Sequence, residues 1–461
     1  MSNIHDQAMH YIYQQVLERL LAHMSQAQRA SLQLLIQRLL VAAGGPEHIG
    51  RFQLLVVHGG DRRSAHLLAS LRAAQLSIAV RTPDTFRLRV LVACLPYTGQ
   101  EALGHHERCF SALFLQDDPR VELLMMADDS LQPFDSRSPV AMRPWASARE
   151  TLLLFGHLAE RSPEALLGSR LHLQLANAVR LALGWNGGAS ALVTALPERQ
   201  RRRYLAWGRR VLRLAGEPAP QALAQCAAAL AEGLGRLQAL ADAPLAPPAN
   251  PAQPADTEAP LRVIAVDDLL RHMLAQDGLD RMLGCQAVGQ AALAGCFEPH
   301  LVASLRHLQA RLTERYAQRQ PARLSLREAQ RGWAQRAHEP ERARFLQAQG
   351  LDEAQLGCLL FAPFAERGRG LAFFVQCCHP RMRVALPYLH RALQGKPCPE
   401  AVKRWLVDIS GLSLAQLQAI YLGRLEPSAS RLLAGLARRS ADLRWLACPS
   451  SAWETVRQAA P

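Results

Sequence analysis

The loop His58-Gly59-Gly60-Asp61 combines residue types that could bind an anion. It follows the apolar run Phe52–Val57, which we predict to be a buried strand, and it precedes a predicted helix over Ser64–Gln75. Glycines let the backbone approach a ligand, and the first turn of a helix offers free amide donors to a phosphate. The loop lacks the spacing of either glycine-rich phosphate-binding motif, Gly-x-x-x-x-Gly-Lys-Ser/Thr or Gly-x-Gly-x-x-Gly. A tight turn is therefore the simpler interpretation, and a nucleotide- or phosphate-binding enzyme is an alternative function.

Asp128 and Asp129 are the second candidate ligand-binding group, and they follow a predicted strand, Val121–Met126. Ligands of α/β sheets gather at the carboxyl ends of the strands. If this strand is parallel to Phe52–Val57, the two carboxylates lie at the same edge as His58 and could support metal binding or acid–base chemistry. An acidic pair after a strand is more simply a turn or a helix cap.

A third arrangement of a strand followed by acids is Val263–Val266 with Asp267 and Asp268. It resembles the opening of a response-regulator receiver domain, and the resemblance implies that these carboxylates bind magnesium. No later strand offers a phosphoacceptor aspartate, and the only lysines of the chain are Lys396 and Lys403. We interpret the resemblance as coincidence.

Histidines and cysteines occur in groups such as His105-His106 with Cys109, and Cys377-Cys378-His379 with Cys398. Structural zinc is usually held by two closely spaced pairs of ligands, and neither group has that spacing. No Gly-x-Ser-x-Gly nucleophile motif is present. We assign no catalytic residue, no metal and no other cofactor, and we do not expect an enzyme.

Positive charge is concentrated in one predicted helix, which also carries Tyr204 and Trp207. Its arginines are Arg199, Arg201, Arg202, Arg203, Arg209, Arg210 and Arg213. Such a helix could contact phosphates while the aromatic rings stack on bases, so a nucleic-acid-binding regulator is an alternative function. Pro399–Arg424 adds a helix-turn-helix outline whose second helix starts at Ser413. The simpler interpretation is a solvated arginine face, because the net charge of +14 is almost all arginine and is spread along the chain.

The elements that must position these residues indicate a mostly α fold with a small α/β unit. Ser25 followed by Gln28, and Ser413 followed by Gln416, predict capping boxes at helix starts. Leu76–Arg81 and Phe86–Cys94 are predicted strands, and Gly99–Leu115 is a predicted helix. The segments are a helical hairpin at 1–48, the α/β unit at 49–140, a helical segment packed on it at 141–240, a proline-rich linker at 241–260, and a mainly helical domain at 261–461.

The composition, with 49% apolar and 20% charged residues, is that of a packed globular protein. No apolar run approaches the roughly 18 residues that a membrane span needs, and the first residues do not look like a signal peptide. Ten scattered cysteines fit reduced thiols, so we expect a soluble, cytoplasmic, bacterial protein. Abundant amphipathic helices without a catalytic motif favour a non-catalytic regulatory or adaptor protein. We expect a protein partner, which self-association could also supply, and no membrane.

Overall fold

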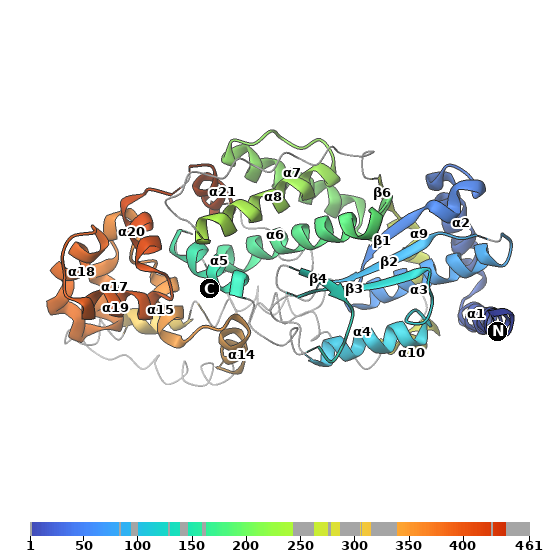
Figure 1. Cartoon of the computed structure of the whole chain (residues 1–461), viewed down its shortest axis with the longest axis horizontal. Helices are drawn as coiled ribbons and strands as arrows, with labels where there is room; N and C mark the ends of the chain where they lie inside the picture. The colour runs from blue at the N-terminus through green and yellow to red at the C-terminus, as the bar shows by residue number, and fades with distance from the viewer. Residues whose placement is uncertain are drawn as a thin grey trace, which may run out of the picture.

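The computed structural model of the chain describes residues 2–82, 84–93, 100–127, 130–138, 146–158, 163–242, 262–274, 278–285, 305, 307–314, 339–425 and 427–438. It confirms the predicted fold class, since in these ranges many helices surround a six-stranded sheet (Figure 1). None of the helices within these ranges is both long and apolar enough to cross a membrane.

The sheet has the strand order β4-β3-β2-β1-β5-β6. Its strands are β1 (Gln53–Val57), β2 (Arg87–Val92), β3 (Val121–Ala127), β4 (Ser130–Pro133), β5 (Ala191–Thr194) and β6 (Arg262–Ala265). All neighbouring pairs are parallel except β3 and β4. Strands of a parallel sheet are covered on both faces, which is why β1 is apolar from Leu54 to Val57 and β2 is buried from Leu88 to Val92.

Helices cover both faces of this sheet. The crossovers β1–α3–β2 and β2–α4–β3 step in one direction and are right-handed, so α3 (Arg62–Ala79) and α4 (Gln100–Ala112) lie on one face. Helices α1 (Ser2–Ala22), α2 (Gln26–Ala43) and α9 (Asp267–Met273) pack against α3. The chain then returns past β1 through α6 (Pro163–Gly184), which contacts β1 and β4 from the opposite face.

A second hydrophobic core, separate from that of the sheet, is built from helices alone. It joins α5 (Ala146–Leu158), α7 (Glu198–Ala215) and α8 (Leu223–Asp242) to α14 (Glu339–Gln349), α15 (Glu353–Phe361), α17 (Leu371–Cys378), α18 (Leu386–Leu393), α19 (Glu400–Ser410), α20 (Leu414–Leu422) and α21 (Pro427–Arg438). Other short helices are η1 (Pro46–Arg51), η3 (Trp185–Gly187), α10 (Gly278–Leu283), α16 (Ala365–Gly368) and η4 (Pro380–Ala385). Along the long axis of the molecule, α17 and α18 lie at one end and α1 at the other (Figure 1).

Two expectations about local structure and boundaries differ from this arrangement. Leu76–Arg81 is not a strand: α3 continues to Ala79, because Leu76 and Ile78 bury their side chains as part of its apolar face. The mainly helical segment 261–461 does not begin as a separate unit, since its first strand, β6, pairs with β5 and its first helices join the core of the sheet. The predicted linker lies almost wholly outside the described residues.

Candidate functional site

The strand order creates one position at which a ligand could reach the backbone. From β1 the chain crosses to β2 on one side, whereas β5 lies on the other side of β1. The connections that leave β1 and β5 therefore diverge, and α/β sheets bind ligands in the crevice that such a divergence opens at the carboxyl ends of the strands. Because β1 and β3 are parallel, the end of β3 also lies at the edge that carries His58. Asp128 and Asp129 themselves lie outside the described residues.

His58, at the end of β1, is buried against a pair of histidines from α4. Its Nδ1 atom is 2.6 Å from Nδ1 of His106, so one ring donates and the other accepts. Burial lowers the pKa of His58 to about 3, and the nearby His105 adds to this effect, so the ring is neutral at pH 7. Nε2 of His58 and Nδ1 of His105 have no hydrogen-bond partner within the described part of the chain. Gly60 has a φ of +75°, and a Cβ there would lie 3.2 Å from the His106 ring.

The other residues of the loop form the turn after β1 and the cap of α3. Asp61 is the N-cap of α3, where its carboxylate accepts the amide hydrogen of Ser64 at 3.0 Å. Gly59 and Gly60 make the turn between β1 and this cap. Throughout the described residues, no three histidine, cysteine or acidic side chains are placed to hold a metal ion. The contacts of this loop are those of a tight turn that starts a helix, the simpler of the two interpretations of its sequence.

A cavity of about 280 Å³ lies beside this loop, where β1, β5 and β6 end. It is lined by Arg63, Ala195, Pro197, Asp267, Leu270, Arg271 and Leu274. None of the four loop residues singled out by the sequence belongs to this lining. The sequence signal for Arg63 is its position two residues after the loop, but nothing in the sequence indicates that Arg271 lies near it.

Asp267 and Asp268, the carboxylates of the segment that resembles a receiver domain, are both held in ion pairs. Asp267 contacts the guanidinium of Arg201 at 2.6 Å, and Arg201 also donates to the backbone carbonyl of Leu196. Asp268 pairs with Arg38 at 2.7 Å, and the hydrogen bond with that arginine lowers the pKa of Asp268 to about 2. Two carboxylates neutralised by arginines do not form a magnesium site, and β6 lies at the edge of the sheet.

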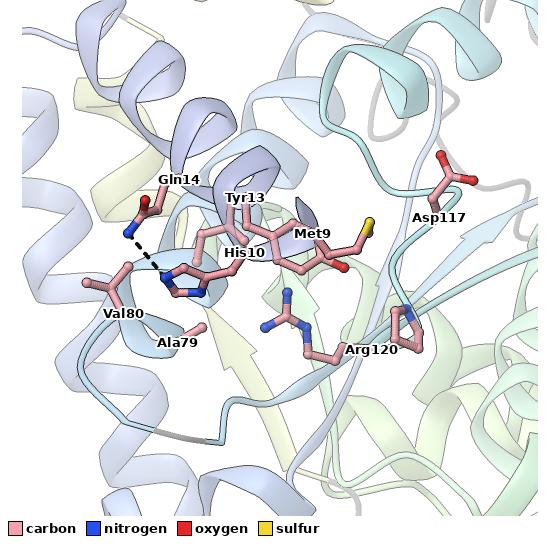
Figure 2. Close-up of a pocket in the computed structure, with 10 residues that line it drawn as sticks. Met9, His10, Tyr13, Gln14, Ala79, Val80, Asp117 and Arg120 are labelled. Atoms are coloured by element: carbon pink, nitrogen blue, oxygen red, sulfur yellow. Dashed lines mark hydrogen bonds between the residues drawn. The ribbon is translucent and has the colours of Figure 1, made fainter. Parts of the chain in front are cut away.

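A second cavity, of about 300 Å³, lies beneath the middle of α1, where Met9, His10, Tyr13 and Gln14 line it (Figure 2). Figure 2 shows the Arg120 guanidinium under the Tyr13 ring, 4.5 Å from its centroid. Arg120 is not available to a ligand, because its guanidinium is paired with the buried carboxylate of Asp118 at 2.7 Å. Asp118 also pairs with the fully buried Arg72, so this network fastens α1 and α3 to the entry of β3.

The predicted arginine helix is α7, and five of the seven arginines predicted for its basic face are exposed. Its exposed arginines are Arg199, Arg202, Arg203, Arg210 and Arg213. At 100° per residue they fall on one side of the helix, over about 21 Å at 1.5 Å per residue. Arg201 faces the sheet, as described above, and Arg209 donates to the carbonyls of Pro220 and Gln221.

The aromatic residues of α7 cannot stack on bases, which corrects the sequence-based expectation. Trp207 is buried, and Tyr204 packs with it against His172 of α6 at ring distances of 4.9 and 5.4 Å. The helix-turn-helix outline also fails as a DNA-binding unit, since α20 buries Gln416, Leu417, Ile420 and Tyr421 in the helical core.

The chain matches no protein-family model, no curated protein and no solved structure.

Proposed function

We propose that the chain is a non-catalytic regulatory or adaptor protein that acts through protein–protein contacts. The observation that carries this proposal is a surface on η4 and α18 where apolar and arginine side chains are exposed together. Val384 is 85% exposed and Tyr388 is 45% exposed, and Phe373 of the adjacent α17 is 37% exposed. Clustered exposed apolar side chains of this size are typical of binding surfaces.

The exposed residues follow a helical spacing. Arg381 and Val384 are three residues apart in a 3-10 helix and therefore share an edge, and Tyr388 and Arg391 continue that edge one and two turns later. All four side chains are exposed. We call Arg381, Val384, Tyr388 and Arg391 the basic–apolar surface.

The charge around this surface indicates what it would bind. No aspartate or glutamate occurs between Glu366 and Glu400, while this interval contains five arginines and one lysine. Tyrosine and arginine are the residue types that contribute most at protein interfaces. A complementary partner would present an acidic segment with apolar anchors, such as an amphipathic helix of another protein.

Site-specific photocrosslinking in the native cell tests this proposal. A photoreactive amino acid at Val384 is expected to capture a protein whose crosslinked segment is acidic and apolar. The same amino acid at Val80, also exposed but at the α3 end of the molecule, is the matched control and should not capture that protein.

Purified components then measure the contact. Tyr388→Ala is expected to weaken the reconstituted complex about 30-fold or more, as for an interface residue worth at least about 2 kcal/mol. Arg381→Glu combined with Arg391→Glu should abolish binding. Adducts only to nucleic acid, to lipid or to a second copy of the chain would contradict the proposal, as would equal capture from Val80.

The arginine face of α7 supports a second candidate, a regulator that binds nucleic acid through its phosphates. Five phosphate contacts predict that the logarithm of the affinity for duplex DNA falls with the logarithm of salt concentration at a slope of about −4.5. Replacing Arg202, Arg203 and Arg210 with Gln should reduce this slope to about −2. Fluorescence anisotropy at several salt concentrations measures both values, and absent or salt-independent binding would dismiss this candidate.

A further inference from the structure

The cavity at the ends of β1, β5 and β6 has an excess of positive charge that its own side chains do not neutralise. The one carboxylate in its wall, Asp267, is paired with Arg201. Arg271 makes no hydrogen bond or ion pair with any other described residue. Arg63 makes one long hydrogen bond, at 3.4 Å, to the carbonyl of Ala195. Two guanidinium groups therefore face this space with most of their donors unused.

The position of the cavity adds to the effect of these charges. Arg63 belongs to the first turn of α3, at the positive end of the helix dipole, and Arg271 comes from a different element, α9. The divergence of the chain between β1 and β5 leaves room for a ligand here, as it does at other switch points of parallel sheets.

The other lining side chains are apolar and select the rest of the ligand. They include Leu270, Leu274 and Pro197, which offer no side-chain hydrogen bonds. The volume of about 280 Å³ is slightly below the range of about 300–1,000 Å³ that is usual for drug-sized ligands. A ligand that fits is small, with a doubly charged group at one end and a compact carbon body at the other.

We propose that this cavity is a binding site for a small phosphate monoester, with Arg63 and Arg271 holding the phosphate and the apolar wall accommodating its carbon body. Guanidinium groups bind phosphate oxygens with two parallel hydrogen bonds, and two arginines match the two negative charges of the group. This site is distinct from the basic–apolar surface and does not depend on the proposed adaptor function.

Isothermal titration calorimetry with the full chain tests the site, using inorganic phosphate and glycerol 3-phosphate at constant ionic strength. Glycerol supplies the uncharged comparison. Binding of glycerol 3-phosphate is expected, with the affinity reduced about tenfold or more in Arg63→Gln and in Arg271→Gln, since hydrogen bonds to charged groups contribute that much. The double variant should show no measurable binding.

Two controls distinguish a lost site from a damaged fold. Arg19→Gln removes an exposed arginine of α1 and should leave the affinity unchanged. The melting temperature of each variant without ligand should stay close to that of the natural chain, because Arg271 is exposed and unpaired. If neither phosphate compound binds, or if the double variant binds glycerol 3-phosphate as well as the natural chain does, the proposal is overturned.

Discussion

His172 of α6 is a fully buried histidine whose two ring nitrogens both lack a hydrogen-bond partner within the described residues. It packs against Tyr204 and Trp207 of α7, which also contact each other, so its ring is a packing element of the helical core. Burial lowers the pKa of His172 to about 4, because the apolar surroundings disfavour the charged imidazolium. The folded protein therefore keeps this ring neutral well below pH 6.5.

The magnitude of the effect follows from the difference between folded and unfolded states. An unfolded chain binds a proton at this residue with a pKa of about 6.5. Between pH 7.5 and pH 5.5 the unfolded state takes up most of one proton and the folded state takes up almost none. The free energy of unfolding should therefore fall by about 1.4 kcal/mol over this interval because of His172 alone. Because the pKa of His172 is lower in the folded state than in the unfolded state, the free energy of unfolding decreases as the pH falls below 6.5.

Replacement by phenylalanine removes this titration while keeping an aromatic ring. Urea denaturation of the natural chain and of His172→Phe at both pH values, followed by tryptophan fluorescence, measures the effect. The stability difference between the two pH values should be smaller by about 1.4 kcal/mol in the variant. Since phenylalanine is the larger side chain, the informative quantity is this difference and not the absolute stability at one pH.

His48→Phe is the matched control, because it makes the same substitution at a side chain that is 61% exposed and 3.8 Å from the exposed Glu47. The change in pH dependence should be larger in His172→Phe than in this control. The reasoning would be refuted if His172→Phe lost as much stability between pH 7.5 and pH 5.5 as the natural chain does.

Two further predictions concern the amino-terminal part of the molecule. Asp118→Asn should lower the free energy of unfolding by about 3–5 kcal/mol, because it leaves the fully buried Arg72 without a counter-ion, whereas Asn in place of the exposed Asp117 should change little. Burial alone would raise the pKa of Asp118, but its arginine partners lower it to about 2. Acid titration should therefore show that this stabilisation is present above about pH 4 and is lost as the pH falls through 2. Asp61→Ala should cost about 1 kcal/mol through loss of the α3 cap, with Asp61→Ser restoring most of it; chemical denaturation that found no loss would contradict the capping role.

The sequence by itself determined the elements whose signals are local. Phe52–Val57 and Val121–Met126 are mostly apolar runs, each with one polar residue, and both form strands in the interior of the sheet. The capping boxes predicted at Ser25 and Ser413 are present, because a cap needs only two side chains three residues apart. The predicted turn at His58–Asp61 is likewise local, because it needs only the positive φ of Gly60 and the helix cap of Asp61.

Only the tertiary structure decided which of these elements meet. The pairing of β5 with both β1 and β6 joins segments more than 60 residues apart, and this pairing creates the cavity that places Arg63 near Arg271. Burial is similarly a property of the whole fold: Trp207 shares a helix with exposed arginines, and its ring is buried because α6, α8 and α21 pack around it in the helical core. Side-chain type and spacing give a residue its chemical capacity, but contacts between distant segments decide whether solvent or a ligand can reach it.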